Sequence, residues 1–344
     1  MHKSVFIDTL KGKPHSRPPV WYMRQAGRVL PSYLELKKNH SFWEMMQTPE
    51  LAAKVTLLPV NDLGVDAAIL FSDILVIPYA MGMGLEFTDN GPVFEDPLRT
   101  VECPPDKLNP QPEKLEFVYR VIDEIINTRP RDVPLIGFCG GPLTVLCYMI
   151  QGIGSNSMFP DAINFFYKNK SLTIKLVDAI TELSAEYMLG QIEHGIDAFQ
   201  LFETHAGLVP SELYAEIFMR SVSRLGKLAK EKGVPFIFFP KGLGTGLAAL
   251  RPEDCDFVGI DWQVSIQYAR KIVNQEIGLQ GNLDPRLLFA DKKVIEAVLQ
   301  KFVDFGSSET KWIFNLGHGF IPETPFENAR FITDWIKNAN WNRD

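Results

Sequence analysis

The chain has 344 residues, of which 46% are hydrophobic and 22% charged, and its formal net charge is −7. These values are typical of a globular protein with a large core, and the mild acidity, without any Lys/Arg block, argues against a nucleic-acid partner. The amino-terminal segment lacks a long apolar run and no stretch of about 18 apolar residues occurs, so we expect a cytoplasmic protein without a signal peptide or membrane span.

Short apolar runs alternate with longer amphipathic stretches along the chain. The runs are rich in β-branched and aromatic residues, as buried parallel strands are. They lie at 19–23, 66–71, 134–139, 197–203, 235–240, 257–262, 279–282 and 312–317. Helical patterns between or after them include 48–64, which begins with Thr48 and Pro49, as well as 210–233 and 324–339.

Eight strands, each followed by a helix, predict a single α/β domain over residues 1–344, a (β/α)8 TIM barrel. A doubly wound open sheet is the main alternative. Against it, no G-x-G-x-x-G turn follows the first strand.

Two further patterns accompany this alternation. A long Pro-rich insertion, 74–111, follows the second strand, and its stretch 85–94 predicts a hairpin around an Asp-Asn-Gly turn. Such insertions usually lie at the active-site face or an interface, although an insertion without a function fits equally well.

The phrases GVDAAILF (64–71) and GIDAFQLF (195–202) are similar, each with Gly after a helix and Asp before a strand, which indicates a repeated helix-to-strand unit.

Active sites of such barrels form at the carboxyl ends of the strands. Arg24 and Arg28 follow the first strand and bracket Gly27, which permits a left-handed backbone that could turn both guanidiniums toward one cavity. Guanidinium groups bind carboxylates bidentately and stay charged, so the pair favours an anionic ligand. Surface salt bridges are the alternative interpretation.

Asp73 follows the second strand in apolar surroundings, where a carboxylate requires N–H donors from the protein or from a ligand. It could instead cap a neighbouring backbone. Tyr148 lies two turns into a helix that begins at Pro142 and could donate to a ligand, although a lone Tyr is more often a core residue. His318 lies between two glycines after the last strand, which would let the backbone approach a ligand and the imidazole point inward.

Four cysteines, Cys103, Cys139, Cys147 and Cys255, form no C-x-x-C pair, so we expect free thiols and no zinc site.

Taken together, these segments resemble the uroporphyrinogen decarboxylase family in the family's order. The similar blocks are WYMRQAGRVLPSY, AAILFSDIL, GFCGGPLTVLCYMIQG, QLFETHAG, VGIDW, QGNLDP and NLGHGF, from about residue 19 to residue 320. The resemblance implies a single-domain TIM barrel, usually a homodimer, that uses neither metal nor organic cofactor. It also implies removal of the four acetate carboxyls of uroporphyrinogen III to give coproporphyrinogen III and CO2 in haem synthesis.

The resemblance further implies site roles. Arg24 and Arg28 would face substrate carboxylates, and Asp73 would accept N–H bonds from the pyrroles. Tyr148, Thr204 and His318 would complete the substrate contacts. Of these, Asp73, Arg24, Arg28, Tyr148 and His318 are the expected catalytic residues. Departures from the commonest family pattern, which bear on fine specificity, are Val29, Ser32 and Lys37.

Three other functions remain as alternatives. A corrinoid-dependent methyltransferase of the same barrel type would carry zinc on a His and two Cys, but no Cys lies beyond Cys255. A non-catalytic tetrapyrrole-binding barrel would need the same polar groups without turnover. A phosphate-handling barrel is suggested only by the Gly-rich turns at 140–141 and 317–319.

Overall fold

The computed structural model describes residues 4–88, 91–102, 104–152 and 158–342. Its main sheet is parallel and runs in the order β1-β4-β5-β6-β7-β8-β9. Each strand overlaps one of the predicted runs. The strands are β1 (Ala68–Ile69), β4 (Leu135–Gly140), β5 (Ala198–Glu203), β6 (Phe236–Pro240), β7 (Phe257–Gly259), β8 (Gly278–Gln280) and β9 (Trp312–Ile313).

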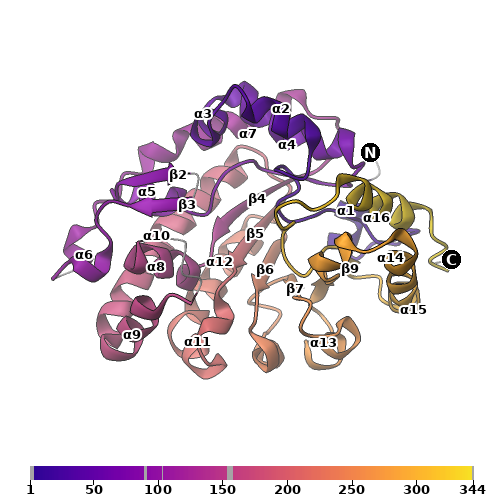
Figure 1. Cartoon of the computed structure of the whole chain (residues 1–344). Coiled ribbons are helices and arrows are strands. Elements are labelled where there is room, and N and C mark those ends of the chain that lie inside the picture. Colours follow the sequence, from indigo (N-terminus) through magenta and orange to yellow (C-terminus); the bar gives the residue numbers. More distant parts are fainter. Residues whose placement is uncertain (1–3, 89–90, 103, 153–157, 343–344) are drawn as a thin grey trace.

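The segment around Val20 joins the two edges of this sheet. Val20 forms a parallel bridge with Phe314, whose N–H donates to the carbonyl of Pro19 at 2.9 Å. On its other side, the N–H of Asp66 donates to the carbonyl of Val20 at 2.8 Å. The first predicted run therefore takes the place of the eighth strand, reduced to a single bridge, and the TIM-barrel prediction is confirmed (Figure 1).

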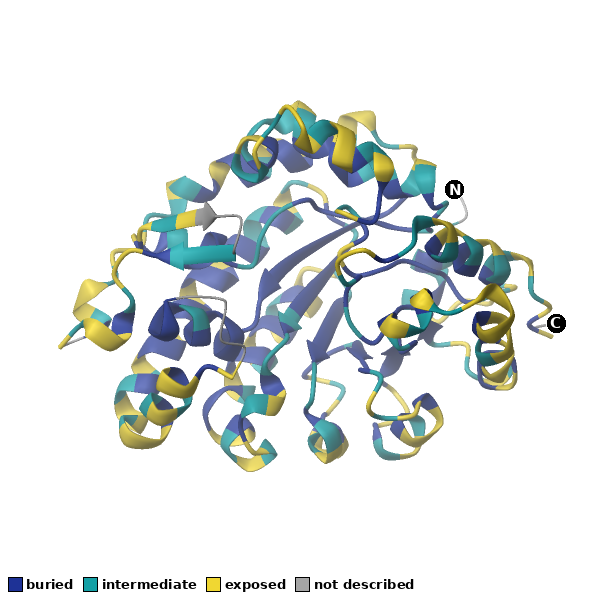
Figure 2. Cartoon of the chain, viewed as in Figure 1, coloured by how far each residue is buried: buried dark blue, intermediate teal, exposed yellow. Residues whose placement is uncertain are grey.

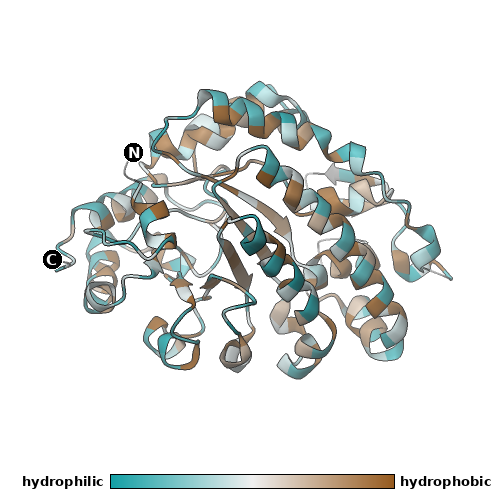
Figure 3. Ribbon diagram, turned by 180° about the vertical axis from the view of Figure 1, so that it is seen from behind, coloured by the Kyte–Doolittle hydropathy of each residue, from teal (hydrophilic) through white to brown (hydrophobic). Residues whose placement is uncertain are grey.

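Helices surround the curled sheet, and their buried residues face it (Figure 2). In α12 the buried positions Val222, Leu225 and Ala229 recur at helical spacing and form one apolar stripe. From behind, the strands are mostly hydrophobic whereas the helices in front of them mix both kinds of residue (Figure 3). The helices are α1 (Val5–Leu10), α2 (Pro31–Lys37), α3 (Phe42–Gln47), α4 (Pro49–Asp62), α5 (Val76–Ala80), α6 (Pro104–Lys107), α7 (Glu116–Thr128), α8 (Pro142–Gln151), α9 (Pro160–Lys168), α10 (Lys170–Glu193), α11 (Ser211–Ile217), α12 (Met219–Glu231), α13 (Ile266–Ile272), α14 (Lys292–Leu299), α15 (Lys301–Ser308) and α16 (Phe326–Asn338).

The predicted helical segments are recovered with small differences. Thr48 is the N-cap of α4 and Pro49 its first residue, but the Thr48 side chain makes no capping hydrogen bond. The stretch predicted as one helix over 210–233 divides at Phe218 into α11 and α12. None of the helices in the described part of the chain is long and apolar enough to cross a membrane.

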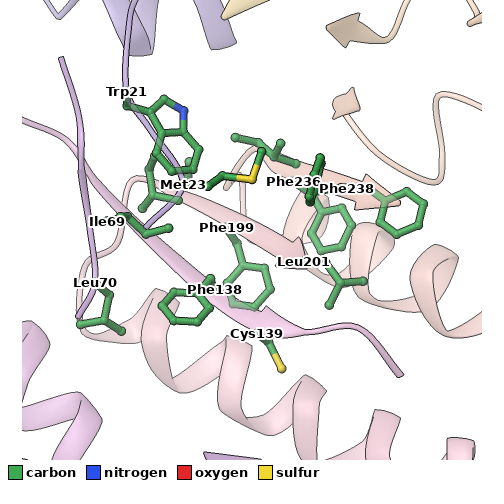
Figure 4. Close-up of a cluster of buried hydrophobic side chains, with 14 of the residues drawn as sticks. Trp21, Met23, Ile69, Leu70, Phe138, Cys139, Phe199, Leu201, Phe236 and Phe238 are labelled. Atoms are coloured by element: carbon green, nitrogen blue, oxygen red, sulfur yellow. The ribbon is translucent and has the colours of Figure 1, made fainter. Parts of the chain in front are cut away.

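A dense core fills the barrel. Trp21, Ile69, Phe138, Phe199 and Phe236 are buried and come from successive strands (Figure 4). The register pairs Phe138 with Gln200, whose side chain is linked through Gln280 to Trp21 across the barrel, so this face of the sheet fills the interior. Phe199 and its partner Phe236 lie on the opposite face, which the helices cover.

Aspartates at the strand starts tie neighbouring strands together. Asp66 and Asp197 are the aspartates of the two similar phrases. A carboxylate oxygen of each accepts the first N–H of the preceding strand. The donors are Val20 for Asp66 and Leu135 for Asp197, both at 2.8 Å. Asp256 does the same for Phe236 at 2.8 Å. The glycines of the two phrases have positive φ angles, 72° at position 64 and 99° at position 195. The internal similarity thus marks a structural unit repeated around the barrel.

The segment 74–111 contains the predicted hairpin. β2 (Leu85–Thr88) and β3 (Gly91–Phe94) pair antiparallel, while Asp89 and Asn90 of the expected turn lie outside the described residues. The N–H of Phe94 donates to the carbonyl of Gly152 at 2.9 Å, which ties the hairpin to the end of α8. That the segment is an insertion relative to other barrels stays a prediction.

Candidate functional site

Arg24 begins the site, and its backbone departs from the sequence-based expectation. The left-handed conformation lies at Arg24 itself, with φ of 61°, and not at Gly27. A non-glycine residue is rarely held there, and such strain concentrates at functional sites. The Arg24 side chain lies against Gly319: a Cβ atom at Gly319 would come within 2.5 Å of Arg24 Cδ.

Asp73 has two carboxylate oxygens that differ in their hydrogen bonding. Its Oδ1 accepts the N–H of Leu75 at 2.8 Å, and its Oδ2 makes no hydrogen bond within the described residues. Burial raises the pKa of this carboxyl to about 6, and the Leu75 bond and the Arg24 charge oppose the increase. Asp73 therefore caps a neighbouring N–H, as one interpretation predicted, and still has an oxygen available for a ligand.

Tyr148 is half-buried on α8 and packs between two rings. Its ring centroid is 5.0 Å from that of Phe159 and 5.7 Å from that of His205. Burial and the nearby Asp73 charge raise the pKa of its hydroxyl, so that it remains a neutral hydrogen-bond donor. Asp73 and Arg24 both act electrostatically on Tyr148, which brings these three predicted residues into one group.

His318 belongs to the same group. Burial, then the charges of Arg24 and Lys241, lower the pKa of its imidazole to about 3. Its Nδ1 is buried and has no hydrogen-bond partner in the described structure. The flanking glycines have a role in packing. A Cβ at Gly317 would lie 2.3 Å from the backbone nitrogen of Trp262 and one at Gly319 would clash with Arg24, so both glycines allow protein neighbours to approach closely. That they also let the backbone approach a ligand stays a prediction.

Arg28 and Thr204 stand apart from these contacts. Arg28 is exposed. Burial raises the pKa of the Tyr33 hydroxyl, and the charge of Arg28 opposes part of this increase. Thr204 is half-buried directly after β5, and neither side chain has a recorded bond to Asp73, Tyr148 or His318.

Glu203 and His205 are functional candidates that sequence reasoning did not select. Glu203 is fully buried and accepts from the N–H groups of Thr144 at 2.7 Å and Leu143 at 3.2 Å and from the Tyr214 hydroxyl at 3.2 Å. Burial raises its pKa to about 7. For His205, burial and the charges of Lys241 and Arg24 lower the pKa to about 4. Both residues lie at the carboxyl end of β5, which is where active-site residues are expected, but the sequence did not reveal that Glu203 is buried under α8.

The described cysteines are unpaired. Cys139, Cys147 and Cys255 are buried free thiols whose pKa values are raised by burial, and Cys103 lies outside the described residues. Within the described ranges, no three His, Cys, Asp or Glu side chains are grouped so as to hold a metal ion.

Known proteins resemble this chain along almost its whole length. A family model described as uroporphyrinogen decarboxylase (URO-D) matches residues 1–339. The chain is 41% identical over 339 residues to the uroporphyrinogen decarboxylase of Pelobacter propionicus, covering 97% of this chain and 98% of that protein. It is 42% identical over 334 residues to the one of Geobacter metallireducens, with 96% and 97% covered.

Among solved structures, a methyltransferase from Methanosarcina mazei is similar with a TM-score of 0.75 and 19% identity, covering 97% of this chain and 98% of that chain. At that identity the likeness concerns the barrel fold alone.

Proposed function

Because the chain belongs to the uroporphyrinogen decarboxylase family, we propose that its strand-end cluster removes the four acetate carboxyls of uroporphyrinogen III and leaves the methyl groups of coproporphyrinogen III. The observation that supports this most is Asp73, whose carboxylate has one oxygen bonded to the backbone and one oxygen without a partner in the described part of the chain, under the influence of the Arg24 charge. Residues 1–344 act in this proposal as one catalytic domain.

Loss of CO2 from an acetate leaves an electron pair that must be stabilised. Protonation of the pyrrole carbon next to the acetate converts the ring into a cationic electron sink, so the proposal requires no metal or organic cofactor. An ionised Asp73 accepts pyrrole N–H bonds, and this interaction strengthens as the ring becomes cationic. The carboxylate therefore lowers the barrier in addition to binding the substrate.

Arg24 supplies the carboxylate anchor in this account. None of the ion pairs among the described residues includes the Arg24 guanidinium, so the group is available for a substrate carboxylate. Arg28 and Thr204 contact more distant substrate side chains from the rim, and Tyr148 and His318 line the cavity as neutral hydrogen-bonding groups. The candidate proton donors are Arg24, Tyr148 and His318.

The direct test is anaerobic incubation of the purified protein with uroporphyrinogen III, followed by oxidation and separation of the porphyrins by carboxyl number. Seven-, six-, five- and four-carboxyl products should appear in succession. Tight binding without loss of carboxyls would contradict the decarboxylase and favour a tetrapyrrole-binding protein.

We further infer a cytoplasmic homodimer. Support comes from Met158 and Tyr167, which are 67% and 60% exposed and line a surface hollow of about 470 Å³ together with Ile163 and Leu208. Large exposed apolar side chains around one hollow are typical of an interface.

Tyr167→Glu should shift the protein to monomers in sedimentation equilibrium. Tyr268→Glu, at a 50% exposed tyrosine on α13, is the matched control and should leave the mass unchanged. Equal masses for all three proteins would contradict this interface.

A further inference from the structure

Lys241 is a cation at the mouth of the barrel that the proposed reaction does not yet use. It follows β6 directly and is half-buried. No carboxylate lies within 4 Å of its ammonium group among the described residues, although many other Lys and Arg side chains of the chain are paired. A partly buried charge without a counter-ion is unfavourable, and a bound anion would remove that cost.

An aromatic ring holds the Lys241 side chain in place. Its Nζ lies 5.8 Å from the centroid of the Trp262 ring, and the guanidinium carbon of Arg286 lies 5.4 Å from the same centroid. The two cations differ in compensation, because Arg286 is paired with Asp284 through Nη2–Oδ2 at 2.6 Å and Nε–Oδ1 at 2.9 Å. Only Lys241 of this pair keeps an unpaired charge.

The nearby carboxylate of Asp261 is occupied by backbone groups. Its Oδ2 accepts the N–H of Gly242 at 2.6 Å and its Oδ1 accepts the N–H of Gln263 at 2.8 Å. Asp261 thus fixes the turn that follows Lys241 and forms no ion pair with the ammonium group.

Lys241 and Arg24 influence the same two histidines. Both positive charges act on His205 and on His318 and help to keep these imidazoles neutral. The Trp262 ring that supports Lys241 is also stacked near His318, with centroids 6.4 Å apart. Two uncompensated cations therefore converge on one pair of histidines from the ends of two different strands.

We propose that Lys241, supported by Trp262, forms a second carboxylate-binding subsite of the cavity and anchors one side chain of a polycarboxylate ligand while Arg24 holds another. The inference rests on the proposed function, which supplies a substrate with eight carboxylates. Two anchors on separate strands fix the orientation of such a ligand, which one anchor cannot do.

Kinetics of a neutral variant test the subsite. Lys241→Met should raise KM for uroporphyrinogen III roughly 10- to 100-fold, as expected for a lost charge-assisted bond, and change kcat by less than about 3-fold. Lys241→Arg should restore KM to within about 3-fold of wild type. The matched control is Arg286→Met, which removes the compensated cation on the same ring and should leave KM nearly unchanged.

Calorimetric binding of coproporphyrinogen III under anaerobic conditions gives a readout independent of turnover, and urea denaturation verifies that each variant is folded. Weaker binding by folded Lys241→Met supports the subsite even if the wild type fails to decarboxylate, an outcome that would contradict only the proposed function. An unchanged KM and affinity in Lys241→Met, or a loss of kcat at constant KM, would overturn the subsite.

Discussion

At the scale of single residues, the two oxygens of Asp73 have different surroundings. One accepts the Leu75 N–H, which fixes the carboxyl plane, and the other has no hydrogen-bond partner among the described residues. Arg24, strained at φ of 61°, acts electrostatically on Asp73 and on the neutral imidazole of His318. The fixed orientation of the carboxylate matters because a preorganised charge needs no rearrangement when the cation forms on the substrate.

The raised pKa of Asp73 predicts a pH dependence. Burial disfavours the ionised form, so the carboxyl of the free enzyme protonates as pH falls through about 6 and loses its negative charge. The value of kcat/KM should therefore decrease below about pH 6. Pyrrole N–H bonds favour the ionised form, so the decrease in kcat should occur at lower pH than that in kcat/KM. Steady-state kinetics from pH 5 to 8 check this, and a flat kcat/KM profile would argue against an essential ionised Asp73.

At the scale of elements, α8 depends on a carboxylate from β5. Its N-cap is Gly141, which offers no side-chain acceptor, and Glu203 supplies the missing acceptor to the N–H groups of Leu143 and Thr144. A Cβ at Gly141 would lie 2.5 Å from the Glu203 carboxyl carbon, so the close contact requires glycine. Glu203 thereby positions the helix that carries Tyr148.

Removal of the Glu203 carboxylate should displace α8 and lower the stability of the protein. We expect Glu203→Ala to lower the free energy of unfolding by about 3 kcal/mol, because two N–H groups and a hydroxyl lose a buried partner, and to reduce kcat. Urea denaturation and kinetics measure the two effects. Glu212→Ala, at an exposed position of α11, is the control and should change neither. An unchanged unfolding midpoint in Glu203→Ala would refute the capping role.

Glu203 also predicts the pH dependence of stability. The pKa of Glu203 in the folded protein is about 7, above the ordinary value of 4.5. Its contribution to the free energy of unfolding is therefore fully present below about pH 4.5 and is lost as pH rises through 7. Relative to Glu203→Gln, which does not titrate, the wild type should lose up to roughly 3 kcal/mol between pH 5 and 8. A constant difference across that range, measured by urea denaturation, would show that burial does not shift this group.

At the scale of the whole molecule, ring closure depends on a single short contact. Within the described ranges the one β-bridge of the first run is at Val20. Asp66 reinforces it by accepting the Val20 N–H at 2.8 Å and an N–H from each of the Arg17 Nη1 and Nη2 atoms at 2.7 Å. Asp66→Ala should lower the free energy of unfolding by about 3 kcal/mol, since it leaves the Val20 N–H without its acceptor and Arg17 without its carboxylate partner. Asp178→Ala, which removes an exposed surface pair with Arg220, should cost less than about 1 kcal/mol. Equal effects of the two changes in urea denaturation would contradict this role of Asp66.

The sequence predicted the strands because each is a short apolar run between helix signals, and it predicted that Asp73, Tyr148 and His318 would lie at one end of the barrel. It could not predict that the first strand is a single bridge, since this depends on pairing with Phe314 across the whole chain. The positive φ at Arg24 and the burial of Glu203 were equally hidden, because both arise from contacts between distant segments. Local pattern therefore identified the elements, and tertiary packing decided the chemistry of individual groups.

The most direct test of the account is turnover by Asp73→Asn under anaerobic conditions, compared with binding of coproporphyrinogen III by the same variant. Asparagine keeps the shape and the cap on Leu75 but carries no charge, so we expect kcat to fall at least about 100-fold while the variant stays folded and still binds the ligand. Turnover within a few-fold of wild type would contradict the central claim that the Asp73 charge stabilises the cationic ring.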